Sequence, residues 1–394
     1  MNIGIFTDTY FPQVSGVATS IETLKNQLET QGHQVYIFTT TDPHVKKDAF
    51  EKNIFRFSSI PFISFTDRRI AFRGMFQAYQ IAKKLNLDIV HTQTEFSMGV
   101  IGKVVARFLS IPCVHTYHTM YEDYLHYVAN GRLLKPVHVK EATLAFCHNM
   151  SGVVAPSNRV LETLKRYGVK SPISIIPTGI NINKFNGKVL NDVRNELNLL
   201  DKPILLSVSR LAYEKNIHEL INAMPKIIAK MSDTTLIIVG DGPAKESLQT
   251  QVREMHLTKN VIFVGEISND EVSDYYHAAD IFVSTSNSES QGLTYIEAMA
   301  SGTKVVVSKS EYTDSLLDDK SLGITFETED EYVDDVMYYL SDVNQINEYH
   351  DNHLLKQKLN EISAETFGEK IVQFYRNAQI KYESKSSKSS ELSN

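Results

Sequence analysis

The sequence predicts two α/β domains, each built on a parallel and doubly wound β-sheet. The chain has 394 residues of ordinary globular composition, about twice the length that one compact domain needs. Short segments rich in β-branched residues alternate with longer segments whose apolar residues follow a helical period. Because this order is typical of parallel sheets and recurs in both halves, we expect two such domains with a cleft between them.

The individual elements follow from the hydrophobic pattern. In the first half we expect strands at residues 2–6, 34–39, 88–91 and 111–115, and helices at 16–30 and 72–85. In the second half we expect strands at 203–209, 235–239, 261–264, 281–284 and 304–308, and helices at 216–230 and 292–301. Ligands of open parallel sheets bind at the carboxyl ends of strands, so the residues that follow each strand are the candidates for function.

We expect the domain boundaries where the alternation of strand and helix segments is interrupted. We expect a first domain over residues 1–177 and a linker over 178–189, which has two glycines and polar spacers. A second domain over residues 190–365 follows, and a helix over 366–383 is expected to pack back on the first domain. Residues 384–394 are mostly serine and lysine, and we expect them to be disordered.

The composition indicates where the protein works and which classes of partner it lacks. No window approaches the ~18 uninterrupted apolar residues of a membrane helix, and the start of the chain lacks a basic leader, so we expect a cytoplasmic protein. Cys113 and Cys147 fit no metal-ligand spacing and are expected to be reduced core residues. The net charge of −7 argues against nucleic-acid binding, but it divides into +8 over residues 1–190 and −15 over residues 191–394.

Two cations follow the first expected strand of the second half. Arg210 and Lys215 stand five residues apart on the strand-to-helix loop. The planar fork of an arginine and the ammonium group of a lysine together suit the oxygens of a diphosphate. Taken alone, the pair also fits a solvated loop with chance charges.

A second group of polar residues follows a later strand. Glu289 and Glu297 stand eight residues apart around a turn that contains Gly292. The glycine permits a close approach of a ligand, and the free N–H groups of Leu293 and Thr294 at the helix start suit a phosphate oxygen. We expect one carboxylate to hold a transferred hexose and the other to hold the ribose of a nucleotide. The alternative is a capping acid and a buried helix acid.

These motifs together resemble a known enzyme family. Arg210-x4-Lys215 followed by Glu289-x7-Glu297 resembles the retaining glycosyltransferases of family 4, whose GT-B fold has two Rossmann-like domains facing each other across a cleft. Three further stretches resemble the bacterial 1,2-diacylglycerol 3-α-glucosyltransferases within that family: residues 6–21, 91–96 and 115–124. The likeness runs through nearly all of residues 1–375.

The resemblance implies roles for two residues of the first domain. Gly16 ends the first strand-to-helix loop, where the family's glycine backbone meets the donor diphosphate, although Ser15 stands where many relatives have a second glycine. His118 matches the active-site histidine beside the transferred sugar, and His115 is the rival position. Alternation along the strand puts the two histidines on opposite faces, so only one of them points to the donor.

Two residues of the second domain are assigned in the same way. Gly240 lies in a glycine-rich turn that the resemblance puts near the nucleotide, although the same residues make a good generic turn. Ile267 ends the segment whose backbone groups pair with the uracil in the family. Both assignments depend on the resemblance.

The resemblance also implies a reaction. We expect a hexosyltransferase that moves glucose from UDP-glucose to the 3-hydroxyl of 1,2-diacylglycerol, with retention, at the cytoplasmic membrane surface. The product would be α-monoglucosyldiacylglycerol, for glycolipid and lipoteichoic acid anchor synthesis. The alternative is a family 4 enzyme with another UDP-sugar or with a soluble or polyprenyl-linked acceptor.

No cofactor besides the nucleotide sugar is expected. The chain has no Asp-x-Asp triplet, so we also expect no metal ion, with Arg210, Lys215 and helix N-termini balancing the charge of the leaving diphosphate. The sequence does not indicate an oligomeric state.

A basic and aromatic run in the first domain suits an anionic membrane surface. Arg68, Arg69, Phe72 and Arg73 begin a run, expected to be helical, that continues to Lys84. Each cation near an anionic bilayer contributes about 1 kcal/mol to binding. We expect these four residues to contact the membrane, so that the protein is peripheral on the inner face. The alternative is a core helix with a solvated basic face.

Overall fold

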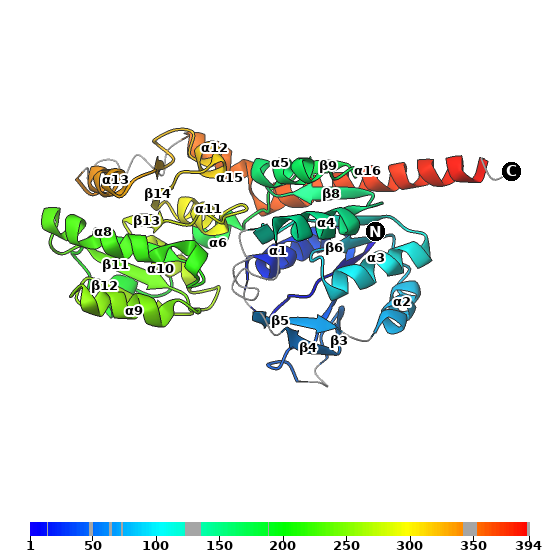
Figure 1. The fold of residues 1–394 in the computed structure, drawn as a ribbon, viewed down its shortest axis with the longest axis horizontal. Helices are drawn as coiled ribbons and strands as arrows, with labels where there is room; N and C mark the ends of the chain where they lie inside the picture. The colour runs from blue at the N-terminus through cyan, green and yellow to red at the C-terminus, as the bar shows by residue number, and fades with distance from the viewer. Residues whose placement is uncertain are drawn as a thin grey trace. The chain divides into compact units, whose positions relative to one another are not determined.

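The computed structural model describes residues 1–13, 15–46, 50–62, 65–71, 74–122, 135–187, 189–341 and 353–391. It forms two compact units, of which the first comprises Met1–Gly179 and Ala364–Asn394 and the second Ile180–Ser363. Each unit has a parallel β-sheet with helices on both faces (Figure 1). The expected fold class, two parallel α/β domains, is confirmed.

The sheet of the first unit has seven parallel strands. Its order is β3 (Ile54–Phe57), β2 (Gln34–Thr40), β1 (Asn2–Phe6), β6 (Ile89–Thr92), β7 (Cys113–Thr116), β8 (Gly152–Ala155) and β9 (Ile173–Ile175). Ile3 of β1 lies beside Val35 on one side and beside Ile89 on the other. Both faces of these strands are apolar because helices cover both of them.

Successive side chains of each strand enter different halves of the core. Phe6, Val90 and Cys113 pack against four helices on one face: α2 (Met75–Lys84), α3 (Ser97–Leu109), α4 (Pro136–Cys147) and α5 (Asn158–Tyr167). Ile5 and Val114 pack against two helices on the other face: α1 (Gly16–Thr30) and α16 (Ala364–Glu391). This alternation follows from the two-residue period of a strand.

The C-terminal helix α16 belongs to the first unit, where it contacts α1 (Figure 1). Ile371 and Tyr375 are fully buried, and the Tyr375 hydroxyl lies 2.7 Å from Nδ1 of His91. The helix continues to Glu391, so the expectation of disorder from residue 384 is wrong over 384–391. Extending a helix that is already packed is much easier than starting one, which accounts for a helical end of serine and lysine.

A β-hairpin replaces the start of the expected basic helix. β4 (Ser59–Phe62) pairs antiparallel with β5 (Phe65–Ala71), so Arg68 and Arg69 lie on a strand. The helix α2 begins only at Met75, after Gly74, whose φ of 121° few other residues adopt. A Cβ atom on Gly74 would lie 2.5 Å from the ring of Phe57. The glycine therefore separates the hairpin from α2.

The second unit has a six-stranded parallel sheet. Its order is β12 (Val261–Gly265), β11 (Thr235–Val239), β10 (Ile204–Val208), β13 (Ile281–Ser284), β14 (Lys304–Ser308) and β15 (Ile324–Phe326). One face packs against α8 (Ile217–Lys230), α9 (Lys245–Glu254) and α13 (Glu329–Ser341). The other face packs against α6 (Ile182–Phe185), α10 (Val272–Ala278), α11 (Leu293–Ala300), α12 (Glu311–Leu316) and α15 (His353–Glu361). The short helix α7 (Val193–Glu196) contacts α10.

Most of the segment expected to be a linker belongs to the second unit, which begins at Ile180 and includes α6, whereas residues 178 and 179 belong to the first unit. Phe185 of α6 is 3% exposed and packs in the core beside Tyr276. Ile180 forms a parallel bridge with Ser363, the last residue of the unit. The aromatic side chain at 185 anchors a segment that its glycines and polar residues had suggested to be a spacer.

In each sheet the first strands are added toward one edge, and the later strands are added on the other side of the first strand. We call the place between these two sets the reversal point. In the first unit this point lies between β1 and β6, and in the second between β10 and β13. Ligands of open α/β sheets bind outside the carboxyl ends of the strands at such a point. The loops after two of these strands, β10 and β13, hold Arg210, Lys215, Glu289 and Gly292, which the sequence singles out.

Candidate functional site

The reversal point of the second unit holds an ion pair between two predicted residues. Lys215 ends the 3₁₀ turn η3 (Tyr213–Lys215) after β10, and its Nζ lies 2.5 Å from Oε1 of Glu289 in the loop after β13. The Thr285 hydroxyl joins the two loops by donating to the carbonyl oxygens of Lys215 and Asn216. Both charged side chains are mostly buried, at 14% and 21% exposure. Arg210 lies on the same loop as Lys215 and is exposed.

The start of α11 lies beside this pair. Gly292 is the N-cap with φ of 61°, and a Cβ atom there would lie 2.7 Å from the ring of Tyr295. The first N–H groups of a helix have no partner within it, so those of Leu293 and Thr294 are available to an anion. The dipole of α11 favours the same charge. This geometry is compatible with a phosphate at the helix start, and the phosphate contact itself stays a prediction.

Glu297 lies deeper in the same helix. Its carboxylate is buried and accepts a hydrogen bond of 2.9 Å from the hydroxyl of Tyr276. Burial raises the pKa of Glu297 to about 7, although the Tyr276 hydrogen bond and the charge of Lys184 act in the opposite direction. Glu289 and Glu297 therefore occupy different environments, one ion-paired and one desolvated.

The glycine-rich turn of the second unit packs on the loop that carries Arg210. Gly240 has φ of 132°, and a Cβ atom there would lie 1.9 Å from the carbonyl oxygen of Ser209. The N–H of Leu211 donates to the carbonyl of Asp241 at 2.9 Å. Gly240 therefore supports the Arg210 loop directly. Ile267, after β12, is partly buried against the core.

The first loop of the first unit is held by buried polar contacts. Ser15 is the N-cap of α1 and accepts a hydrogen bond of 3.1 Å from the N–H of Ala18, which leaves Gly16 as the exposed first residue of the helix. Asp8, which follows β1, is 2% exposed and accepts from Thr94 Oγ1 at 2.6 Å and from the N–H of Met98 at 3.0 Å. The Asp8 carboxylate thus fixes the loop to the start of α3.

The two candidate histidines have different surroundings. His115 is fully buried, and its ring contacts the ring of Phe146 edge-on with 4.9 Å between centroids. His118 lies two residues beyond the end of β7 and is partly exposed. Its Nε2 lies 2.6 Å from Oε1 of Gln93, the residue after β6. Accessibility favours His118 over His115 as the residue that meets a substrate.

Glu95, which the sequence alone did not single out, binds His115. Nε2 of His115 lies 3.0 Å from a Glu95 carboxylate oxygen, and the Tyr121 hydroxyl donates to the other oxygen at 2.5 Å. Nδ1 of His115 lies 2.9 Å from the carbonyl oxygen of Thr92 and 3.0 Å from its hydroxyl oxygen. Sequence spacing does not reveal this cluster because its members come from two strands and a later turn.

The structure describes only part of the predicted membrane contact. Arg69 donates from Nε and Nη2 to the hydroxyl and carbonyl oxygens of Ser59, at 2.9 and 2.8 Å, within the hairpin. Arg68 lies on β5, and Phe72 and Arg73 lie outside the described residues. On the neighbouring helices, Phe76 of α2 and Phe108 of α3 are 75% and 69% exposed.

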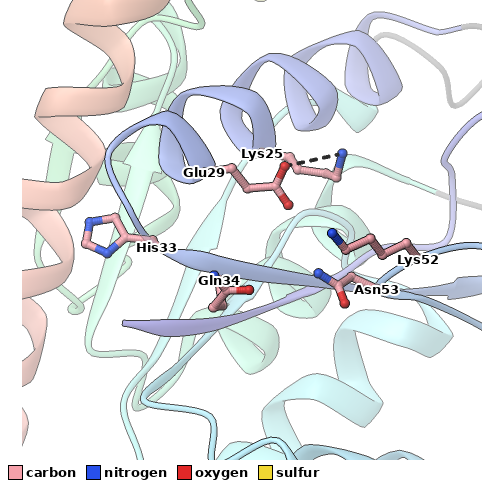
Figure 2. A pocket seen from close by; sticks show the side chains of 6 residues that line it. All are labelled: Lys25, Glu29, His33, Gln34, Lys52 and Asn53. Atoms are coloured by element: carbon pink, nitrogen blue, oxygen red, sulfur yellow. Dashed lines mark ion pairs between the residues drawn. The ribbon is translucent and has the colours of Figure 1, made fainter.

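A pocket of about 340 Å³ lies away from the predicted residues of the first unit. Figure 2 shows the side chains around it, which belong to the amino ends of β2 and β3 and to the later half of α1. The lining residues are Lys25, Glu29, His33, Gln34, Lys52 and Asn53. Because ligands of parallel sheets bind at the carboxyl edge, this pocket is not part of the candidate site.

Neither a metal-ligand cluster nor a membrane span occurs among the described residues. Within those ranges no group of three or more His, Cys, Asp or Glu side chains is arranged to hold a metal ion. No helix in the same part of the chain is both long and apolar enough to cross a bilayer.

Comparison with known proteins identifies the family. Residues 14–184 match the profile of Glycosyltransferase Family 4, and residues 191–353 match that of Glycosyl transferases group 1. The alpha-monoglucosyldiacylglycerol synthase of Streptococcus pneumoniae is 46% identical over 96% of this chain and 86% of its own length. The enzyme of the same name from Acholeplasma laidlawii is 34% identical over 84% of this chain and 86% of its own length.

Solved structures agree on the fold. HepE of Anabaena in complex with UDP has a TM-score of 0.76 at 18% identity, covering 95% of this chain and 99% of that chain. Sucrose-phosphate synthase from Thermosynechococcus elongatus has a TM-score of 0.77 at 23% identity, covering 95% of this chain and 98% of that chain. The chain belongs to glycosyltransferase family 4 and has the GT-B fold, as the sequence motifs indicated.

Proposed function

We propose that the protein transfers glucose from UDP-glucose to the 3-hydroxyl of 1,2-diacylglycerol with retention of the α configuration. The observation that carries the proposal is the 46% identity, over nearly the whole chain, to an alpha-monoglucosyldiacylglycerol synthase. The charged groups at the reversal point of the second unit suit the donor. The product would be α-monoglucosyldiacylglycerol.

The second unit supplies the donor site in this proposal. Lys215 and Arg210 face the diphosphate, and the N–H groups at the start of α11 bind a phosphate oxygen. Glu289 accepts hydrogen bonds from hydroxyls of the glucose, and Glu297 from those of the ribose. In the structure Lys215 and Glu289 neutralise each other, so each is held in place before the donor arrives.

The reaction needs little more than orientation and charge stabilisation. The bond from the anomeric carbon to the β-phosphate oxygen breaks, and the bond to the acceptor oxygen forms on the same face. The departing phosphate oxygen takes the proton of the acceptor hydroxyl, so UDP and the glucolipid are the products. His118 lies beside the sugar in this scheme, and the cations stabilise the leaving diphosphate.

Diacylglycerol stays in the bilayer, so the first unit must approach a membrane. Phe76 and Phe108 expose apolar rings on neighbouring helices, and Tyr79 bridges them with its ring 6.1 Å from that of Phe108. Lys83, Lys84 and Arg107 are exposed on the same two helices. Exposed rings beside cations suit an anionic lipid surface. We place the protein on the cytoplasmic face of the cell membrane, and the prediction that Arg68, Arg69, Phe72 and Arg73 contact the lipid is part of this proposal.

Donor binding is tested by removing the cations. The double variant Arg210→Ala with Lys215→Ala should lower kcat/KM by about 30-fold to 1000-fold, because removing charge stabilisation of a leaving group costs about 2–4 kcal/mol. Lys230→Ala is the matched control, since Lys230 forms an exposed ion pair with Asp334 elsewhere in the unit. Full activity of the double variant would contradict the assignment.

The acceptor is tested by the product. Vesicles that contain diacylglycerol and anionic phospholipid are incubated with UDP-glucose, UDP-galactose or UDP-N-acetylglucosamine, and the lipids are separated by thin-layer chromatography. We expect monoglucosyldiacylglycerol from UDP-glucose alone. A product only with another sugar, or only with a soluble or polyprenyl acceptor, would replace the proposal by the alternative within the family.

Membrane contact is tested separately by co-sedimentation with the same vesicles at low salt. Phe76→Ser with Phe108→Ser should reduce binding, whereas Ile380→Ser, which removes an equally exposed apolar side chain from α16, should not. The charge reversals Arg68→Glu, Arg69→Glu and Arg73→Glu test the basic run itself. Undiminished binding of both multiple variants would exclude this face as the membrane contact.

A further inference from the structure

Gln93 stands at the reversal point of the first sheet. It is the first residue after β6, and its backbone N–H donates to the carbonyl oxygen of Phe6 at 2.9 Å, across the gap between β6 and β1. Its side chain is 2% exposed. The backbone and the burial together fix the amide group at the carboxyl edge of the sheet, where a ligand of this fold binds.

The amide oxygen of Gln93 constrains the ring of His118. Oε1 lies 2.6 Å from Nε2 of the histidine. An amide oxygen only accepts hydrogen bonds, so Nε2 must carry a proton. A neutral His118 ring with that proton on Nε2 has its lone pair on Nδ1. The contact therefore selects the tautomer that can accept a hydrogen bond from a hydroxyl at Nδ1.

The other end of the same amide is a buried donor without a partner. Nε2 of Gln93 is inaccessible to solvent and makes no hydrogen bond. A buried N–H group without a hydrogen-bond partner destabilises the fold, and such groups are rare in folded proteins. In this position, next to a histidine that faces substrate in the proposed function, the group is suited to an oxygen atom that arrives with a ligand.

We propose that Gln93 is a positioning residue that links His118 to the bound substrate. Its Oε1 holds the histidine with the proton on Nε2, and its Nε2 donates a hydrogen bond to a hydroxyl or ether oxygen of the substrate. That oxygen belongs either to the transferred sugar or to the lipid acceptor. The inference rests on the proposed function for the identity of the substrates, but the tautomer of His118 does not depend on it.

The tautomer is measured in the ligand-free protein by ¹⁵N NMR of histidine-labelled material. The chain has 13 histidines, and the His118 signals are assigned by their loss in His118→Gln. We expect a protonated Nε2 and an unprotonated Nδ1 in the parent protein, and a mixture of tautomers in Gln93→Met. A proton on Nδ1 alone in the parent would overturn the proposal, whatever the substrates are.

The substrate contact is measured by kinetics with vesicles of diacylglycerol and UDP-glucose. Gln93→Glu keeps an oxygen for His118 but removes the amide donor, so it should keep the Nε2 proton and raise one KM about tenfold. Gln93→Met should lower kcat as well, because the ring is no longer held. A rise in the KM for UDP-glucose assigns the oxygen to the sugar, and a rise in that for diacylglycerol assigns it to the acceptor.

Thr39→Val is the matched control. The Thr39 hydroxyl is also buried without a hydrogen bond, on β2 of the same sheet, and valine keeps its shape. This variant should change neither KM nor the NMR signals of His118. If Gln93→Met and Gln93→Glu behaved like this control, Gln93 would be only a core residue and the proposal would be wrong.

Discussion

Replacing Glu297 by glutamine should make the protein more stable above neutral pH. The carboxyl group is buried, and burial raises its pKa from the ordinary 4.5 to about 7. Below pH 4.5 the group is protonated in both the folded and the unfolded state. Between pH 4.5 and 7 the unfolded chain ionises first, so the free energy of unfolding falls as pH rises, and the loss is complete above 7. At about 1.4 kcal/mol per pKa unit, the total is about 3 kcal/mol.

The assay is urea unfolding of the parent and of Glu297→Gln at pH 5 and at pH 8. The chain has no tryptophan, so far-ultraviolet circular dichroism is the signal. The difference between parent and variant at each pH removes the contribution of the first unit, which the two proteins share. Glutamine keeps an acceptor for the Tyr276 hydroxyl, so the change isolates the charge. Glu246→Gln, on the exposed side of α9, is the control, and it measures how much the same substitution changes the free energy of unfolding at an exposed position.

The expected result is a gain of about 2.5 kcal/mol at pH 8 relative to pH 5 for Glu297→Gln, because the unfolded carboxyl group is already partly ionised at pH 5, and none for the control. An equal difference at both pH values would show that Glu297 ionises normally in the fold and would refute the reasoning. The proposed contact between Glu297 and the ribose predicts a second result, in the pH dependence of UDP binding. If ribose hydroxyls donate to the ionised carboxylate, UDP affinity of the parent rises from pH 5 to 8, whereas that of Glu297→Gln stays constant.

Three further outcomes are expected. Gly240→Ala should cost about 3 kcal/mol in thermal or urea unfolding, since its Cβ would meet the Ser209 carbonyl, whereas Gly265→Ala, with φ of 90° and open space around it, should cost about 1 kcal/mol. Asp8→Ala should destabilise the protein by about 2–4 kcal/mol because it leaves the Thr94 hydroxyl and the Met98 N–H unpaired, with Asp8→Asn intermediate in the same measurement. Glucosyl transfer in detergent should survive EDTA, and a strict, reversible need for Mg²⁺ or Mn²⁺ would disprove metal independence.

The hydrophobic pattern predicted most of the two sheets. The expected bounds of β1, β11, β13, β14 and α1 agree with the structure to the residue. The hydrophobic pattern gave the wrong secondary structure where contacts with distant or preceding segments determine it. The run from Arg68 to Ala71 was expected to lead into a helix, but Arg69–Ala71 pairs with residues 59–61 in a hairpin, and pairing with a segment earlier in the chain leaves no periodic signal. The serine-rich end was helical for a similar reason, because a packed helix precedes it.

The candidate site was predictable where charge and glycine mark it. Lys215 and Glu289 were both selected from the sequence, yet their ion pair was not foreseen, because 74 residues separate them and only the strand order brings them together. Gln93 was not selected at all. A glutamine after a strand has no distinctive spacing, and its importance comes from a histidine 25 residues later on the adjacent strand's loop.

Because α16 packs in the first unit, this unit can finish folding only after the second unit has been synthesised. The face of the first sheet that carries Ile5 and Val114 is covered in part by Ile371 and Tyr375, which leave the ribosome after the second unit. The whole of Ile180–Ser363 is made before them. The usual rule that the N-terminal domain folds first therefore cannot apply in full. On the ribosome the first unit therefore stays incomplete, with the part of this face that α16 covers still exposed, until the second unit has emerged.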